Sequence, residues 1–296
     1  MYKNTSFNKF FCYSLILFLY IQTLASSTAQ FHFPYQLDNP YEKHLLPIEL
    51  REISGIVSID SVQIACVQDE WGMVFIYNLK KKSVTDTHRF DSIGDFEGIA
   101  YNGLSLFVLR SDGRLTEWEN FHPQHPKGNI LHHTFSLLTS DNEGLCFDIV
   151  SNRLLMASKN KPHSSGKKNE RIIYAININH RPLKSEVIFR IIDASIGKSA
   201  SSFGIKQQEK SHKNNSFHFR PSGIAIHPIS KHLYIISASD YLLAVFRRNG
   251  ELLFIKKLNP DIFPKAEGIT FLDDGTMLIS NEGKKEEGNI LTFRCN

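Results

Sequence analysis

A short motif built around glycine recurs five times along this chain and constrains its fold more than any other feature. In each copy the glycine follows Glu or Ser and precedes an apolar run, as in Phe96-Glu-Gly-Ile-Ala-Tyr101. Successive copies lie 43 to 46 residues apart, except for one interval of 79; the glycines are Gly55, Gly98, Gly144, Gly223 and Gly268. A period of this length indicates a repeat protein.

Further apolar runs follow each motif after short polar turns. In the fourth repeat they are residues 221–226, 233–236, 242–246 and 252–256, and comparable runs follow the other motifs. Four short strands in a unit of about 45 residues are typical of a propeller blade. We therefore predict an all-β, five-bladed β-propeller, with six blades as the alternative that the long interval leaves open.

The fifth repeat ends before a fourth strand can form, so the ring needs another source for it. Residues 44–50, which precede the first motif, contain an apolar run that includes Pro47. Proline is tolerated in an edge strand, because an edge strand can leave one N–H group without a ladder partner. We predict that residues 44–50 complete the last blade and close the ring.

Two stretches of the chain are rich in Ser, Lys, Asn and His and poor in apolar residues. They are residues 159–170 and residues 195–218, and the second lies inside the 79-residue interval. Such a composition cannot bury enough apolar area to form a blade. We predict one β-propeller domain over residues 30–296, with both stretches as solvated loop insertions.

Residues 1–29 differ in composition from the rest of the chain. Lys3 and Lys9 precede an apolar run over residues 10–21, and small residues follow as far as Ala29. This order is typical of a signal peptide, and the run is shorter than the roughly 20 residues of a membrane-spanning helix. We predict a signal peptide, with an uncleaved N-terminal membrane anchor as the alternative. Either places the protein in the periplasm, outside the cell or at the cell membrane through its N-terminus.

Charge and cysteine content exclude several classes of protein. The chain has 34 Lys and Arg against 30 Asp and Glu, a net charge of +4 that is too small and too dispersed for nucleic-acid binding. Its four cysteines form no CxxC pair, which argues against a zinc ribbon or a thioredoxin-type site. Cys66 and Cys146 lie in apolar runs, and we expect them to be buried thiols.

The five motifs together resemble the SdiA-regulated (YjiK-like) family of exported bacterial β-propeller proteins. The resemblance covers about residues 45–294 and rests on Phe96–Tyr101, Asn142–Phe147, Arg220–Ile226, Leu233–Ser239 and Ala266–Phe271. It implies a five-bladed propeller with a bound calcium ion, and a distant likeness to phytase-type propeller hydrolases that depend on calcium. It implies no catalytic mechanism, and the chain departs from the family pattern where Ser54 and Ser222 replace Glu.

The residue before each motif glycine is the strongest candidate for a functional site. If the motif strand is the innermost of its blade and its side chains alternate, Glu97, Glu143 and Glu267 meet at one end of the central channel, with Ser54 and Ser222 beside them. Carboxylates in one narrow space favour a cation, and oxygen ligands suit calcium. The alternative is that each Glu accepts backbone N–H bonds from the next blade and only locks the repeats together.

The turns after the second strands of the blades could supply a second ring of ligands. They contain Asp69-Glu70, Ser111-Asp112, Ser239-Asp240 and Asn281-Glu282, although such turns often hold Asp and Asn for local hydrogen bonds alone. We include Glu282 among the predicted metal ligands. Trp71 and Trp118 are expected to pack between blades.

These features predict an exported, calcium-binding propeller that acts as a binding or scaffold module of the cell envelope or exterior. Its ligand or envelope partner is unknown, and we expect a monomer that contacts membranes only through an uncleaved N-terminus. The alternative is a calcium-dependent phosphoester or ester hydrolase, in which bound metal activates water. Arg110 and Arg220 are the only arginines near the motif strands, a small number for binding a polyphosphate. No catalytic residue or organic cofactor is predicted.

Overall fold

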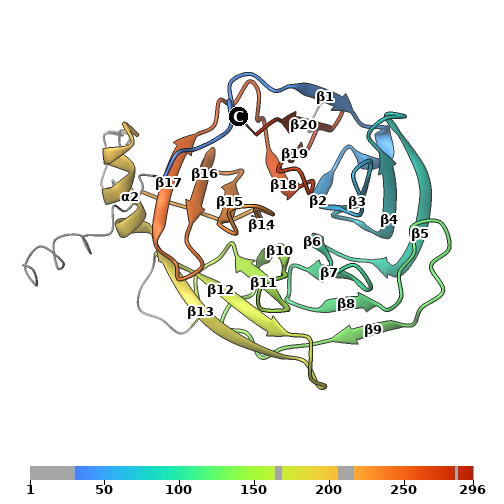
Figure 1. The fold of residues 1–296 in the computed structure, drawn as a ribbon. Coiled ribbons are helices and arrows are strands. Elements are labelled where there is room, and N and C mark those ends of the chain that lie inside the picture. The colour runs from blue at the N-terminus through green and yellow to red at the C-terminus, as the bar shows by residue number, and fades with distance from the viewer. Residues whose placement is uncertain (1–30, 164–168, 206–216, 284–285, 296) are drawn as a thin grey trace, which may run out of the picture. The chain divides into compact units, whose positions relative to one another are not determined.

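Five four-stranded antiparallel sheets succeed one another around a central axis (Figure 1). This computed structural model describes residues 31–163, 169–205, 217–283 and 286–295. The chain divides into residues 1–33 and a unit from Pro34 to Asn296, and the sheets lie in the second unit. The predicted signal peptide or anchor, residues 1–29, lies outside the described residues. Five blades are confirmed and the six-bladed alternative is wrong.

Each blade is numbered by its place in the sequence, and its strands run outward from the axis in chain order. Blade 1 contains β2 (Ile53–Ser58), β3 (Gln63–Gln68), β4 (Trp71–Asn78) and β5 (Ser83–Ile93), and blade 2 contains β6 (Phe96–Tyr101), β7 (Leu106–Arg110), β8 (Leu115–Trp118) and β9 (Ile130–His133). Blade 3 contains β10 (Asn142–Asp148), β11 (Arg153–Ser158), β12 (Glu170–Asn177) and β13 (Lys184–Ile192). Blade 4 contains β14 (Gly223–Ile226), β15 (Leu233–Ser237), β16 (Leu242–Phe246) and β17 (Leu252–Lys257).

Blade 5 is built from both ends of the described chain. It contains β18 (Ala266–Phe271), β19 (Met277–Asn281) and β20 (Asn289–Phe293), and β1 (Glu42–Leu45) pairs antiparallel with β20 as its outermost strand. Closure by the N-terminal segment is therefore confirmed, but the strand lies at residues 42–45 rather than 44–50. Pro47 lacks an N–H group and precedes a short 3₁₀-helix, η1 (Ile48–Leu50), so the strand ends before it.

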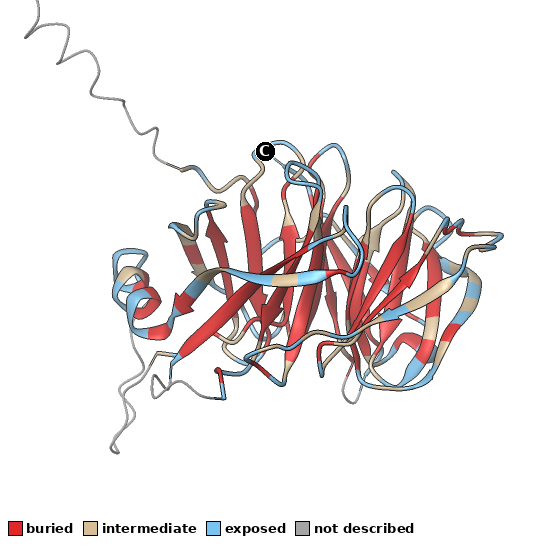
Figure 2. Cartoon of the chain, turned by 90° about the horizontal axis from the view of Figure 1, so that it is seen from below, coloured by how far each residue is buried: buried red, intermediate tan, exposed pale blue. Residues whose placement is uncertain are grey.

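Burial follows the position of a strand within its blade. The three inner strands of each blade are mostly buried (Figure 2), whereas the outermost strands β5 and β13 consist mainly of exposed and partly exposed residues, with one buried residue each. An inner strand packs against neighbouring blades on both faces, so continuous apolar runs are what it requires. Cys66 and Cys146 are buried free thiols, as predicted, and Cys295 is an exposed one.

The first part of the segment 195–218 is not the solvated loop that its composition predicts. Helix α2 (Asp193–Ser202) covers its first part and packs between β13 and β17, where Ile196 and Ala200 are buried. These two residues lie four positions apart and so share one face of the helix. The polar sequence forms a helix here because the wedge between blades 3 and 4 buries that face. Residues 206–216 lie outside the described part of the chain, as do 164–168 within the connection from β11 to β12.

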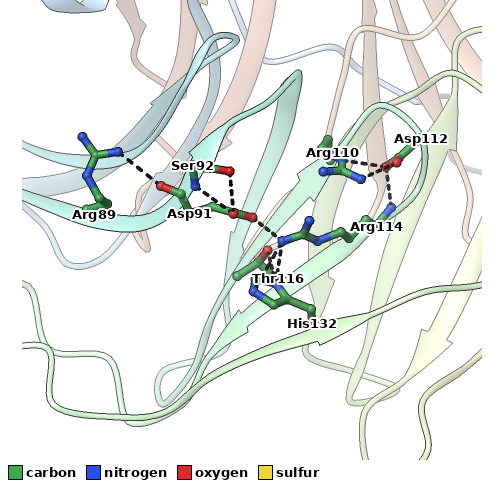
Figure 3. A network of polar contacts seen from close by, with 8 residues as sticks. All are labelled: Arg89, Asp91, Ser92, Arg110, Asp112, Arg114, Thr116 and His132. Atoms are coloured by element: carbon green, nitrogen blue, oxygen red, sulfur yellow. Dashed lines mark hydrogen bonds and ion pairs between the residues drawn. The ribbon is translucent and has the colours of Figure 1, made fainter.

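Ion pairs join neighbouring blades. Figure 3 shows the network between blades 1 and 2, in which Arg114 binds Asp91 of β5 and lies 3.1 Å from Nδ1 of His132 on β9. Between blades 3 and 4, the fully buried Asp148 lies 2.5 Å from a guanidinium nitrogen of Arg248 and 3.2 Å from Nε of Arg153. Within the residues that the structure describes, no helix is long and apolar enough to span a membrane.

Candidate functional site

The motif glycines bring the innermost strands of neighbouring blades into close contact. A Cβ atom added at Gly98 would lie 2.7 Å from the carbonyl oxygen of Glu143, and one at Gly223 would lie 2.5 Å from that of Glu267. Any larger residue would push two blades apart at the axis. The glycine therefore recurs because five strands converge there.

The residue before the glycine is the extra residue of a β-bulge in four of the five blades. The pairing of the first two strands shifts register between Ile53 and Gly55, and equivalent shifts occur in blades 2, 3 and 5. A bulge re-aims a side chain and interrupts simple alternation along a strand. Simple alternation was therefore the wrong basis for placing these side chains, although the bulge still brings the three glutamates to the axis.

Glu97, Glu143 and Glu267 line one narrow cavity at the axis, with residues from all five innermost strands. Its volume is ≈ 10 Å³, which is room for about one water molecule or one ion. The Glu143 and Glu267 side chains are almost completely buried. Three carboxyl groups from three blades thus line one cavity, as the repeat position predicts, and the Glu97 side chain is less buried than the other two.

Burial and mutual repulsion make these carboxyl groups hard to ionise. Burial, followed by the charges of Glu143, Asp95 and Glu267, raises the pKa of Glu97 to about 9. Burial and the charge of Glu267 raise the pKa of Glu143 to about 8, although Lys159 acts in the opposite direction. The pKa of Glu267 is also raised, mainly by burial. Without a compensating cation the site favours protonated carboxyl groups at neutral pH.

Two lysines supply part of that compensation. The Nζ atom of Lys159 binds Oε1 of Glu143, and that of Lys265 binds Glu282 and lies 3.3 Å from Oε1 of Glu267. Neither lysine was among the residues predicted from the sequence. Lys159 follows the second strand of blade 3, the position that Glu282 occupies in blade 5, and this equivalence was the available signal.

Acidic residues outnumber basic ones at two further repeat positions around the cavity. Three residues before the glycines stand Glu52, Asp95, Asp141, Arg220 and Lys265, and directly after the second strands stand Asp69, Ser111, Lys159, Ala238 and Glu282. Burial and the charges of Glu52, Glu282 and Glu70 raise the pKa of Asp69 to about 6. The surroundings of the cavity therefore carry an excess of negative charge, which attracts cations.

The two serines of the motif bind the backbone of the neighbouring blades. The hydroxyl of Ser54 donates to the carbonyl oxygen of Phe96 at 2.6 Å, and that of Ser222 donates to that of Ala266 at 2.7 Å. Each bond joins one blade to the next. The interlocking role that we considered for the glutamates is thus filled by the serines, whereas Glu143 and Glu267 contact lysines.

The turns after the second strands of the blades contain Asp112, Asp240 and Glu282, whose partners are of two kinds, arginine and lysine. Asp112 accepts two bonds from Arg110, at 3.0 and 2.6 Å, and Asp240 is bound in the same bidentate way by Arg220. These pairs support local structure and also engage both arginines that a phosphate substrate would need (Figure 3 shows the Arg110 pair). Glu282, predicted as a fourth metal ligand, contacts Lys265 and does not line the axial cavity.

The carboxylate oxygens of Glu97, Glu143 and Glu267 are chemically suitable ligands for calcium, but they do not surround a single point in this structure. Oε2 of Glu143 is buried without a hydrogen-bond partner among the described residues. Such an orphaned oxygen is costly and marks a place for a missing donor or cation. In the described part of the chain, however, no three Asp, Glu, His or Cys side chains form a metal-binding group.

The tryptophans differ from each other. Trp118 is buried, and its ring centroid lies 6.2 Å from that of His88 on β5 of blade 1, which confirms the expected packing between blades. Trp71 is 43% exposed and lines a groove near the closure strand, so the same expectation is wrong for it.

Comparison with solved structures agrees with the fold. The chain is similar to glutaminyl cyclase from Myxococcus xanthus, with 12% identity, a TM-score of 0.54, and coverage of 87% of this chain and 96% of that one. It is also similar to a streptogramin B lyase, with 10% identity, a TM-score of 0.48, and coverage of 87% and 99%. The likeness to glutaminyl cyclase shows a shared fold, and an identity this low says nothing about activity.

Comparison by sequence identifies the family. No curated protein sequence matches the chain. The model of the SdiA-regulated family matches residues 60–285, which include the motifs of blades 2 to 5 and most of blade 1. The resemblance seen in the motifs is therefore confirmed, and this chain belongs to the SdiA-regulated family of β-propeller proteins.

Proposed function

We propose that this protein is an exported, calcium-binding β-propeller that works as a binding module of the cell envelope or exterior. The ion would be held by Glu97, Glu143 and Glu267, with Glu282 close to the site through Lys265. Export is inferred from the composition of residues 1–29. In this role calcium supplies charge compensation and links three blades at the axis.

The observation that carries the proposal is the buried Oε2 atom of Glu143, which has no hydrogen-bond partner among the described residues. It belongs to a carboxyl group that shares a cavity of ≈ 10 Å³ with Glu97 and Glu267. Three carboxyl groups in one cavity, two of them buried and the third partly buried, are stable either protonated or beside a cation. A calcium ion satisfies the orphaned oxygen and removes the mutual repulsion together.

Lys159 and Lys265 compete with a metal ion for the same carboxylates. Glu143 and Glu267 raise the pKa of the Lys159 ammonium group, outweighing the opposite effect of burial. Calcium binding therefore requires Nζ of Lys159 to leave Oε1 of Glu143. The affinity for calcium is therefore the difference between the interaction of calcium with the carboxylates and the interaction of Lys159 with Glu143. This competition favours reversible binding over permanent occupancy.

The hydrolase alternative lacks a comparable observation in its favour. Arg110 and Arg220, the arginines closest to the motif strands, are held by Asp112 and Asp240. The surroundings of the cavity are acidic, and acidic surroundings repel phosphate. We therefore favour a binding module over a phosphoester hydrolase.

Calorimetric titration of calcium into chelator-treated protein tests the proposal. We expect the parent to bind calcium more tightly than magnesium, which is smaller and keeps its water. Glu143→Gln should weaken calcium binding about tenfold or more, since contacts to charged groups are worth about 1.5–3 kcal/mol. Glu117→Gln is the matched control, because its side chain is equally buried but binds Arg181 in another part of the molecule.

The variant Lys159→Met distinguishes calcium binding from a permanent ion pair between Lys159 and Glu143. If the lysine competes with calcium, the variant binds calcium more tightly than the parent. If the pair is permanent, the variant gains no calcium affinity and loses about 3–5 kcal/mol of stability, because it leaves a buried charge without a partner. Lys256→Met is the control, since Lys256 is 34% exposed like Lys159 and pairs with Asp38 instead. Absence of calcium binding in the parent at millimolar concentrations would refute the proposal.

A further inference from the structure

A large groove lies between blade 5 and blade 1, away from the axial cavity. Its volume is ≈ 720 Å³, within the range of small-molecule sites. The walls come from the end of β1 and from β4 and β5, and are mainly apolar: Leu45, Leu46, Trp71, Met73, Phe75 and Val84. Leu45 and Trp71 are 56% and 43% exposed, so apolar surface here faces solvent.

The groove follows from the way in which the ring closes. The closing strand β1 has four residues, whereas β5, the outer strand of blade 1, has eleven. Because the chain leaves the sheet at Pro47, the outer part of the wedge between the blades receives no further strand. Helix α2 fills the corresponding wedge between blades 3 and 4.

A second, smaller cavity continues the groove on the other side of Trp71. It measures ≈ 190 Å³ and shares Glu49 and Trp71 with the larger one as lining residues. Its other acidic side chains are Glu52 and Glu70, and its one basic side chain is Arg51, which lies 3.6 Å from Glu52. The smaller cavity is therefore acidic where the larger one is apolar.

Acidic side chains also outnumber basic ones in the larger cavity. Its basic residue, Lys82, is held by Glu42 at 2.5 Å, and Glu49 and Glu287 are its acidic residues. Over both cavities four glutamates face two basic side chains. An apolar wall, an exposed indole ring and an acidic end are complementary to a molecule with an apolar body and one positive charge, because cations also bind aromatic faces.

We propose that this groove between blades 5 and 1 binds an organic cation with a linear apolar body. The body lies in the cavity formed by Leu45, Met73 and Phe75, and the cationic head reaches the acidic cavity beside Trp71 and Glu70. This site is separate from the axial glutamates and does not depend on calcium.

Calorimetric titration of octylammonium, below its micelle concentration, tests the proposal. We expect saturable binding at one site. Salt should weaken this binding, because it screens the attraction between the ammonium group and the glutamates of the acidic cavity. Octanoate and octanol carry the same chain without the positive charge, and both should bind at least tenfold more weakly. Shortening the chain from octyl to hexyl removes two methylenes and should weaken binding roughly fifteenfold, since each buried methylene contributes about fourfold.

Two pairs of variants locate the site. Leu45→Lys places a positive charge in the apolar wall and should weaken octylammonium binding at least tenfold, whereas Leu104→Lys, at a residue 58% exposed in blade 2, should leave it unchanged. The double variant Glu49→Gln/Glu70→Gln should weaken binding severalfold and reduce its salt dependence. Glu186→Gln/Glu251→Gln removes two charges elsewhere and serves as its control.

Three results would overturn the proposal. One is the absence of octylammonium binding at millimolar concentration in the folded parent. Another is equal affinity for octylammonium, octanoate and octanol, which indicates nonspecific apolar adsorption. The third is equal loss of binding in the Leu45 and Leu104 variants, or no effect of the double glutamate variant beyond that of its control. Melting curves of each variant show whether it is folded.

Discussion

The raised pKa of Glu97 makes a quantitative prediction about stability and pH. Burial and the charges of Glu143, Asp95 and Glu267 raise this pKa from 4.5 to about 9. The folded protein then retains a proton that the unfolded chain releases, so stability falls as pH rises between these two values. From pH 4.5 to pH 7 the loss is about 3 kcal/mol, at about 1.4 kcal/mol for each unit of pH.

Glu97→Gln removes the titrating group and keeps its size. In calcium-free buffer the variant and the parent should have similar unfolding free energies near pH 5, and at pH 7 the variant should be more stable by about 3 kcal/mol. Urea denaturation of both proteins from pH 5 to pH 8 measures the difference directly. Comparing the pair cancels the titration of every group that the two share.

Calcium and a surface variant provide the controls. Glu186→Gln, at an exposed position of β13, should follow the parent at every pH. If calcium binds the three glutamates, adding it should stabilise the parent more than Glu97→Gln. A constant difference between Glu97→Gln and the parent from pH 5 to pH 8 would show that Glu97 is ionised in the folded protein, which contradicts the raised pKa.

Two further predictions concern ring closure and the helix between blades. A chain that starts at Gly55 lacks β1 and the buried Leu46, Leu50 and Ile53. Its free energy of unfolding should fall by about 5–9 kcal/mol, at about 1.5–3 kcal/mol for each buried side chain. A melting temperature equal to that of residues 30–296 would contradict the closure role. Ile196→Ala in α2 should cost about 2–5 kcal/mol and Ile192→Ala, 45% exposed, much less. Equal melting temperatures for the two variants would show that the apolar face of α2 contributes nothing to the stability of the wedge.

The sequence by itself determined the repeat architecture, because the information is local. A motif with glycine, followed by short apolar runs at a period of about 45 residues, requires strands of limited length that pack on both faces. The missing last strand required an N-terminal one, and that strand exists at residues 42–45. The position of Glu97, Glu143 and Glu267 in the repeat was also sufficient to bring them together at the axis.

The tertiary structure alone decided what surrounds those residues. Lys159 follows the second strand of blade 3 and Lys265 precedes the first strand of blade 5, and both reach the glutamates because these segments lie beside the axial cavity. The repeat position of a lysine does not show by itself which carboxyl group it binds. Helix α2 forms in a polar stretch because two blades bury its single apolar face. The groove beside Trp71 exists because a four-residue strand closes the ring beside an eleven-residue one, and neither length indicates a cavity until the two blades are side by side.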